Sequence, residues 1–235
     1  MPSAQKVEVD DELARGQAEP DLYTLLREIH ASNGSKLNSL HRRGTILFAE
    51  GEPARGIYIL RAGRAAVSIS SSEGRVVILH MAQPGDVLGL NSTLRNASYD
   101  TTVKTLEPCG TDFILRGQLL ELMETSDAAK RAVLKILSGE LTNLTNRTRS
   151  LLLAQTARAR LAHLLLEWTR ETNGNNSRQL RIDKVFTHEQ IAQMICSSRE
   201  TVTRLLATLS QRKIIQVTAD SILISDREGL EQIAL

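Results

Sequence analysis

The side chains best suited to recognition chemistry stand close together between residues 187 and 204. An arginine presents a planar fork that matches O6 and N7 of guanine, and a carboxylate accepts a hydrogen bond from the N4 amino group of cytosine. Arg199, Glu200 and Arg204 are therefore the candidate base-reading residues. Contacts to the phosphates fix the register of a protein on DNA without reading its sequence, and they suit the hydroxyls of Thr187, Ser198 and Thr201. Thr203 is expected on the same outer face as the candidate base readers.

An alternative interpretation is open for two of these residues. Glu200 and Arg204 stand four residues apart, which is the spacing of an ordinary surface ion pair on a helix. The two interpretations are compatible, because such a pair would also orient the arginine before it meets DNA.

Two short helices must position these side chains. Thr187 suits the N-cap of a helix over 188–194, with Glu189 and Gln190 in its first turn, near the positive end of the helix dipole. After a turn at Cys196 and Ser197, Ser198 suits the N-cap of a second helix. This helix buries Val202, Leu205, Leu206 and Leu209. The pattern predicts a helix-turn-helix, whose second helix enters the major groove by its N-terminal part. The segment 213–225 then predicts a hairpin with its turn at 218–221, which is the wing of a winged helix.

The sequence upstream predicts two further parts. Short apolar runs at 45–48, 57–60, 65–69, 76–81 and 101–105, separated by glycine-rich and proline-containing turns, predict β-strands in a small barrel or jelly roll. A short helix over 117–123 and a long helix over 126–152 follow. One stripe of the long helix repeats near the 3.5-residue coiled-coil period and consists of Val133, Leu137, Leu141, Leu144, Thr148 and Leu151. The stripe packs either on the chain's own β-domain or, as we favour, on the same helix of a second subunit.

Composition limits the class of protein. The 235 residues carry a net charge of +2, but the segment 152–213 holds ten basic side chains against five acidic ones, which favours phosphate contact. Neither a catalytic Ser/His/Asp or Cys/His arrangement nor a phosphate loop is present, so we expect no enzyme. Cys109 and Cys196 belong to no metal-ligand cluster, and no metal or cofactor is identified. Without a membrane-spanning run or a signal peptide, the expected location is the cytoplasm.

The order of these parts resembles the cyclic-AMP receptor protein and fumarate-nitrate reduction regulator superfamily of bacterial transcription factors. The resemblance covers roughly residues 37–230 and is strongest at the glycine-rich strands with Pro84-Gly85-Asp86 and at the helix-turn-helix with Ser198-Arg199-Glu200. It implies an α+β fold: an N-terminal tail and short helix (1–36), a jelly-roll β-barrel sensor (37–125), a dimerisation helix (126–152) and a winged helix-turn-helix (155–235). It also implies a homodimer that reads palindromic double-stranded DNA with TGTGA-like half-sites. RNA polymerase is a further candidate partner, although no sequence rule marks the surface that would touch it.

The same resemblance points to a sensor site, and here the sequence departs from the family. Nucleotide-binding members use a glycine-glutamate pair for the ribose and an arginine-serine pair for the cyclic phosphate. Gly89 matches, but Leu90 stands in place of the glutamate, and Tyr99-Asp100 stands near the arginine-serine pair. Leucine cannot bond a ribose hydroxyl, and aspartate repels a phosphate, so we expect an effector other than cyclic AMP. The remaining residues that this resemblance places at the pocket are Thr101, Thr145 and Asn146.

Several alternatives stay open at this stage. The β-domain could be a cyclic-nucleotide sensor of the usual kind, a haem-based gas sensor that uses His80 or Met81, or a domain that needs no effector. A sensor or interaction module that does not bind DNA is a second class of function, against which the helix-turn-helix argues. The sequence leaves activation and repression, the target genes and the effector undetermined.

Overall fold

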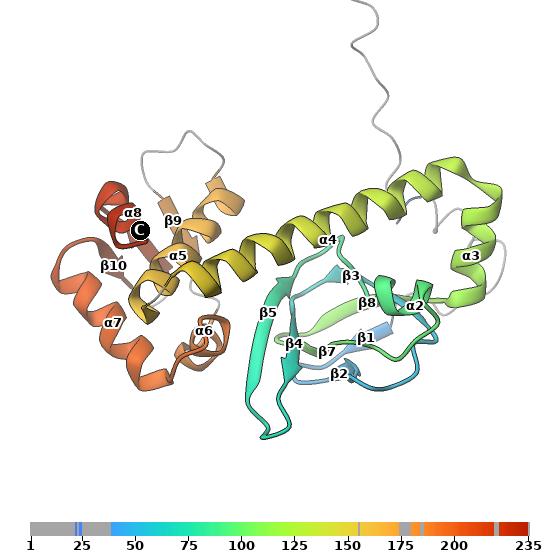
Figure 1. Ribbon diagram of the computed structural model, residues 1–235, viewed down its shortest axis with the longest axis horizontal. Helices are drawn as coiled ribbons and strands as arrows, with labels where there is room; N and C mark the ends of the chain where they lie inside the picture. The colour runs from blue at the N-terminus through green and yellow to red at the C-terminus, as the bar shows by residue number, and fades with distance from the viewer. Residues whose placement is uncertain are drawn as a thin grey trace, which may run out of the picture.

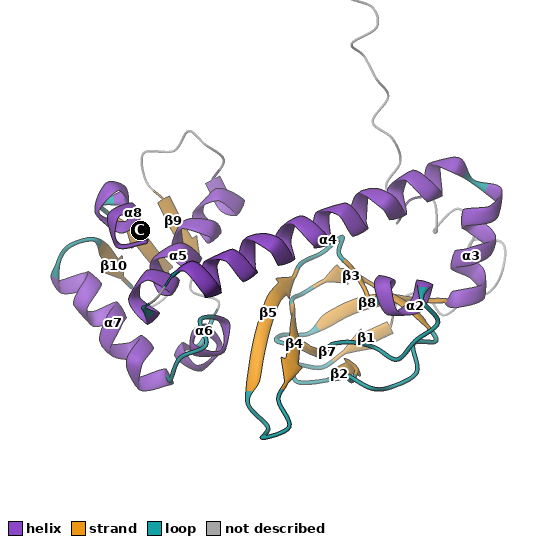
Figure 2. Cartoon of the chain, viewed as in Figure 1, coloured by secondary structure: helices purple, strands orange, loops and turns teal. Residues whose placement is uncertain are grey.

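The computed structural model describes Leu22, Thr24 and residues 39–154, 156–173, 180–183, 186–218 and 221–234. The predicted N-terminal tail and the predicted polar loop after residue 173 lie outside these ranges. Figure 1 shows a β-domain and a smaller C-terminal domain connected by one long helix, and Figure 2 shows the same chain by type of element.

The β-domain consists of two antiparallel four-stranded sheets, in the strand orders β1-β8-β3-β6 and β2-β7-β4-β5. This alternation of strands between two facing sheets is a jelly roll, as predicted. The strands are β1 (Ser39–His41), β2 (Ile46–Phe48), β3 (Gly56–Ala62), β4 (Ala65–Ser70), β5 (Val76–Ala82), β6 (Val87–Leu88), β7 (Thr102–Thr105) and β8 (Cys109–Leu115). A single short helix, α2 (Leu90–Leu94), interrupts them.

The alternation of side chains along the strands builds two apolar cores from this domain. The core between the two sheets contains Phe48, Leu60, Val67, Tyr99 and Val103. The second core lies between β3, β8 and the helices that follow, and it includes Ile57, Ile59, Leu90, Leu119 and Val133.

Two helices connect the domains. Helix α3 (Arg116–Thr125) ends at Ser126, whose extended backbone stops the helix and whose hydroxyl then accepts from the backbone N–H of Ala129. Helix α4 (Asp127–Leu153) therefore begins one residue later, as one 27-residue helix. Both helices confirm the sequence prediction to within two residues at each end. At about 1.5 Å per residue, α4 is about 40 Å long and passes along both domains (Figure 1).

The C-terminal domain is a winged helix-turn-helix. Its elements are α5 (Ala157–Asn173), β9 (Leu180–Asp183), α6 (His188–Met194), α7 (Arg199–Gln211), β10 (Ile215–Val217), β11 (Ser221–Ile224) and α8 (Arg227–Ala234). Strands β10 and β11 form the predicted hairpin, and β9 adds to the outer edge of β11. Trp168 packs on Phe186 with ring centroids 4.6 Å apart, so this tryptophan belongs to the core of the domain.

The two domains are packed against each other. Helix α6 contacts β5, and the core of the DNA-binding domain extends onto Ala66 and Ile78 of the β-domain, which are buried in the same apolar cluster. Met81 and Leu106 pack against its margin. The position of the helix-turn-helix is therefore set by the sheet as well as by the short connection between the end of α4 and the start of α5, which we call the hinge.

Candidate nucleic-acid interface and sensor site

The two helices of the helix-turn-helix begin at the predicted caps. The hydroxyl of Thr187 accepts from the backbone N–H of Gln190 at 3.2 Å, and Oε1 of Gln190 accepts from the backbone N–H of Thr187 at 2.8 Å, which is a capping box. The hydroxyl of Ser198 accepts from the backbone N–H of Thr201 at 3.2 Å. Each such cap stabilises its helix by about 1 kcal/mol.

Helix α7 has one buried and one open face. Val202, Leu206 and Leu209 are buried, and Leu205, which we expected to be buried, is half-buried. The predicted readers Arg199, Glu200 and Arg204 are exposed, as is Thr203. The structure therefore places all the base-reading candidates together on the outer face of one helix.

Glu200 bends back toward its own helix. Hydrogen bonds from its own backbone N–H and from the Ser198 hydroxyl lower the pKa of its carboxyl, so it is ionised at neutral pH. No ion pair joins it to Arg204, although the structure describes both residues. The Glu200 carboxylate therefore accepts hydrogen bonds at the N-terminus of its own helix.

His188 also belongs to this face, and the sequence analysis missed it. Its Nδ1 lies 2.8 Å from the Thr203 hydroxyl, while Thr203 also donates to the carbonyl of Arg199 at 3.0 Å. The first helix of the motif therefore contacts the second on the exposed face of α7, at Thr203. A histidine at the first position of a helix gives no sequence signal of such a contact.

The turn between the helices is sharp and is held from outside. Cys196 has a positive φ of 51°, and the backbone N–H of Ser197 donates to the carbonyl of Ala192 at 2.9 Å. Arg160 of α5 donates to the carbonyl of Ile195 at 2.8 Å and to that of Ala154, beside the hinge, at 3.1 Å. The turn and the hinge therefore share one guanidinium.

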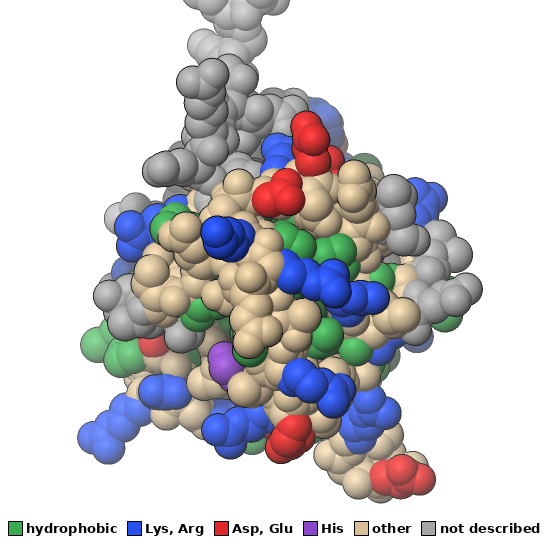
Figure 3. Space-filling model, turned by 90° about the vertical axis from the view of Figure 1, so that its left-hand side faces the viewer, with side chains coloured by type: hydrophobic (Ala, Val, Ile, Leu, Met, Phe, Trp, Pro, Cys, Tyr) green, Lys and Arg blue, Asp and Glu red, His purple; other side chains and the backbone are tan. Residues whose placement is uncertain are grey.

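The surface around these helices is basic. Exposed arginine and lysine side chains spread over this end of the molecule, while the acidic ones lie toward its edges (Figure 3). The described basic residues of the domain that are exposed are Arg158, Arg181, Arg199, Arg204, Arg212, Lys213 and, on α8, Arg227. A surface of this kind attracts the phosphate backbone of a nucleic acid.

At the predicted sensor site, the side chains fill the space themselves. Gly89 has φ of 78°, and a Cβ atom there would lie 2.6 Å from the Tyr99 ring, so only glycine fits. Leu90 is 1% exposed and packs in the core beneath α3 and α4. It therefore faces away from a ligand and is part of the structural core.

Tyr99 occupies the interior of the barrel. Its ring stacks on Phe48 with centroids 3.9 Å apart, and its hydroxyl donates to the carbonyl of Gly56 at 2.6 Å. Burial, together with the neighbouring Tyr58, raises the pKa of Tyr99 to about 12, so the ring stays neutral. Asp100, next to it, is exposed and accepts from the side-chain amide of Asn91 at 3.0 Å, and Thr101 is half-buried.

The surroundings of Asp100 are acidic. Although Glu140 on α4 is exposed, partial desolvation by the atoms around it and the nearby charges of Asp100 and Asp86 raise the pKa of its carboxyl to about 7. Three carboxyl groups thus act on one another where the resemblance places a bound phosphate. This environment disfavours an anion.

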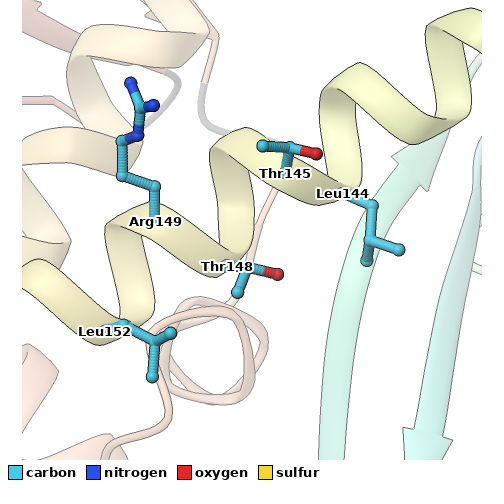
Figure 4. Close-up of a pocket in the computed structure, with 5 residues that line it drawn as sticks. All are labelled: Leu144, Thr145, Thr148, Arg149 and Leu152. Carbon is cyan, nitrogen blue, oxygen red and sulfur yellow. The ribbon is translucent and has the colours of Figure 1, made fainter.

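Thr145 and Asn146 are exposed on α4, and the Thr145 hydroxyl donates to the carbonyl of Leu141 in its own helix. Beside them lies a shallow hollow of about 420 Å³, lined by Leu144, Thr145, Thr148, Arg149 and Leu152 (Figure 4). Within one chain, these residues form part of the open side of α4.

The predicted dimer stripe divides into two parts. Val133 is buried and Leu137 half-buried, and both pack in their own chain's core. Leu141 and Leu144 are exposed, together with Leu134 and Leu152, which the prediction did not include. The side chain of Leu151 lies outside the described ones.

The two residues of β5 that were considered as haem ligands differ in their exposure. His80 is exposed, whereas Met81 is half-buried against the apolar cluster between the domains. Among the described residues, no cluster of three or more His, Cys, Asp or Glu side chains has the arrangement of a metal site. No helix in the described part of the chain is long and apolar enough to cross a membrane.

Comparison with known proteins agrees with both halves of this description. Residues 40–126 match the cyclic nucleotide-binding domain family, and residues 159–233 match the Crp-like helix-turn-helix domain family. The chain belongs to the cyclic-AMP receptor and fumarate-nitrate reduction regulator superfamily. It is a transcription regulator with a helix-turn-helix DNA-binding domain and a sensor domain of the cyclic nucleotide-binding type.

Individual members of the superfamily match over most of their length. A CRP-like cAMP-activated global transcriptional regulator of Mycobacterium tuberculosis is 28% identical over 80% of this chain and 84% of its own. The global nitrogen regulator of Synechococcus elongatus is 24% identical over 91% and 97%. The structure of FixK2 from Bradyrhizobium japonicum has a TM-score of 0.73 at 23% identity, covering 84% of this chain and 96% of its own. The first of these relatives is named as a transcriptional regulator and the second as a nitrogen regulator, while FixK2 shares the fold.

Proposed function

We propose that this member of the superfamily acts as a homodimer that reads two DNA half-sites, under the control of a β-domain that does not take cyclic AMP. The observation that carries the DNA-reading part is the exposed face of α7, where Arg199, Glu200 and Arg204 project from a capped helix. In a helix-turn-helix this face enters the major groove. The arginines then pair with guanine, and Glu200 pairs with cytosine, as TGTGA-like half-sites require.

The second subunit is proposed from the open side of α4. Leu134, Leu141 and Leu152 are 65%, 66% and 75% exposed, and Leu144 and Thr148 continue the same side. Leu134, Leu141 and Thr148 follow at intervals of seven residues, which is the seam of a coiled coil. Since Val133 and Leu137 already pack within the chain, this open stripe is the surface left for the same helix of a second copy.

A dimer accounts for the geometry of the target. Two-fold symmetry presents two copies of α7, and half-sites read from one side of B-DNA lie about 34 Å apart. The expected site is therefore a palindrome. The protein then acts in the bacterial cytoplasm, where the chromosome lies, with RNA polymerase as a further candidate partner and no catalysis of its own.

The sensor part is proposed from the filled barrel. Tyr99 occupies a position at which a cyclic nucleotide would need a polar partner, Leu90 is buried in the core and offers none, and Asp100 and Glu140 add negative charge. The packing of Tyr99 on Phe48 specifically favours a regulator that needs no effector as the second candidate. A haem sensor remains a less supported alternative, because Met81 packs between the domains.

The test is a gel shift on a duplex that carries two TGTGA-like half-sites. We expect affinity to fall steeply between 50 and 200 mM salt, on the order of 10³-fold if about six phosphates are contacted. Arg199→Ala should lose about 1–3 kcal/mol of specific binding, which is about 5- to 150-fold. Arg227→Ala is the matched control, because Arg227 lies on α8 in a 2.8 Å ion pair with Glu231. Equal binding by the two variants would refute the assignment of the reading face.

A further inference from the structure

Arg147 connects three elements that belong to different parts of the molecule. It projects from α4, and its Nη2 donates to the carbonyl of Ile78 on β5 and to the carbonyl of Met194 at the end of α6, each at 2.7 Å. One nitrogen thus holds the dimerisation helix, the sensor sheet and the helix-turn-helix together.

The position of Arg147 in α4 is as informative as its bonds. Val133, Glu140 and Arg147 follow at intervals of seven residues, so they share the side of α4 that faces the β-domain. Val133 is buried there, whereas Arg147 places a guanidinium on the same side of the helix, where an apolar side chain would be expected. Burial lowers the pKa of Arg147, partly offset by the charge of Glu167, and its Nε has no hydrogen-bond partner among the described residues. An apolar side chain at this place would contribute more to packing, so the arginine indicates another role, which is to fix the relative position of the elements that it binds.

The two carbonyls that Arg147 binds are suited to a positional role. Met194 is the last residue of α6, and the final carbonyls of a helix lack partners within it and carry its negative partial charge. A guanidinium therefore caps this end. Ile78 and Met194, whose carbonyls Arg147 binds, are both buried in the apolar cluster between the domains, and hydrogen bonds are stronger in apolar surroundings.

A second arginine completes the arrangement. Arg160 holds the next carbonyl, that of Ile195, and also that of Ala154 beside the hinge. Arg160 thus fixes the turn to its own domain and hinge, while Arg147 alone of the two reaches the sensor sheet. The turn leads directly to Ser198 and the reading face.

We propose that Arg147 is a positioning residue that fixes the helix-turn-helix to the sensor sheet and thereby sets the half-site spacing that the dimer accepts. The proposal rests on the proposed function, because spacing has meaning only for a dimer that reads two half-sites. Without the clasp, formed by Arg147 with the carbonyls of Ile78 and Met194, the domain turns more freely about the hinge. The dimer then tolerates a second half-site that is displaced along the DNA and rotated around its axis relative to the first.

The experiment measures DNA affinity as a function of spacing. The probes are duplexes with two TGTGA-like half-sites whose separation is changed by one base pair in either direction. We expect the wild-type protein to prefer the best spacing by about tenfold or more, and Arg147→Met to reduce this ratio to about threefold or less. Arg147→Lys should restore part of the ratio, because an ammonium group also offers several donors. Lys135→Met, which removes an exposed charge from the same helix, should leave the ratio unchanged.

The ratio separates positioning from stability. A variant that only folds less well binds every spacing more weakly by the same factor, so an unchanged ratio in Arg147→Met would overturn the proposal. A wild-type protein that shows no spacing preference would instead contradict the proposed two-site reading.

Hydrogen exchange, measured without DNA, tests whether the clasp holds β5 and α6 together. In hydrogen exchange, Arg147→Met should speed exchange in β5 and α6 together, while Lys135→Met should not. Unchanged exchange in either element would overturn the clasp.

Discussion

Single residues decide what the sensor domain can hold. In the β-domain, Gly89 is pressed against the Tyr99 ring, and the Tyr99 hydroxyl shares the carbonyl of Gly56 with the hydroxyl of Thr93. The loop, the aromatic stack and the start of α2 are therefore one packed unit. A change at Gly89 cannot be absorbed locally, because the neighbouring atom is a ring held on two sides.

Gly89→Ala is expected to destabilise the protein by about 1–3 kcal/mol, because it adds backbone strain at a positive φ and a contact with Tyr99. Gly117→Ala is the control, since a Cβ there meets nothing within 4 Å and alanine suits a helix better than glycine. It should be neutral or stabilising by up to about 1 kcal/mol. Urea unfolding of both variants measures the difference. Equal stability would show that the Gly89 loop moves away from Tyr99.

The residues that sequence reasoning found and missed differ in kind. The caps Thr187 and Ser198 were predictable because capping depends on neighbours along the chain. Arg147 and His188 were not, because their partners lie 47 and 15 residues away. The signal for Arg147 was present in one form only: a charged residue at the seven-residue interval that begins with Val133. It becomes interpretable once the fold shows what faces that side.

At the level of elements, α4 has two apolar sides with different partners. The side with Val133 and Leu137 stabilises its own β-domain, while the side with Leu134, Leu141 and Leu152 is open. The sequence predicted one stripe because the two sides are less than a third of a turn apart. The two sides can be distinguished only in the folded protein, where the β-domain covers one of them and leaves the other exposed.

Leu141→Asp should therefore convert the proposed dimer to a monomer without unfolding it. The carboxylate would be buried against the partner helix, but it would meet only water in the free chain. Asn143→Asp introduces the same charge about 200° around the helix and should leave the dimer intact. Sedimentation at micromolar concentration measures the state. Thermal unfolding checks that both variants fold, and a dimeric Leu141→Asp would place the interface elsewhere.

Three of the elements that were missed share a physical cause. Strands β1 and β6 contain three and two residues, and α2 contains five, so none carries enough periodicity to be recognised. Helix α2 is held by tertiary contacts, such as the Thr93 hydroxyl on the carbonyl of Gly56 at 2.8 Å. Most of the longer elements, with their own periodicity and breaks, were found within a few residues, but strand β8 (Cys109–Leu115) and helix α8 (Arg227–Ala234) were not predicted.

At the level of the whole molecule, the contact between the domains was beyond sequence reasoning. Ile78 reads as an ordinary strand residue, yet it packs with the core of the DNA-binding domain. The partition of a buried residue between two cores depends on how the domains dock. Strand β5 of the sensor sheet is therefore in direct contact with α6.

Thermal unfolding can test whether cyclic AMP binds to the sensor domain. A ligand that binds only the folded state at 100 times its Kd stabilises it by about 2.7 kcal/mol, which for a chain of this size raises Tm by about 5–11 °C. We expect 1 mM cyclic AMP to leave Tm unchanged, because Tyr99 fills the site and Asp100 opposes the phosphate. The palindromic duplex serves as the positive control and should raise Tm in the same assay. A rise of several degrees with cyclic AMP would mean that Tyr99 leaves its stack on Phe48, and Tyr99→Phe would then show whether the bond to Gly56 had held it there.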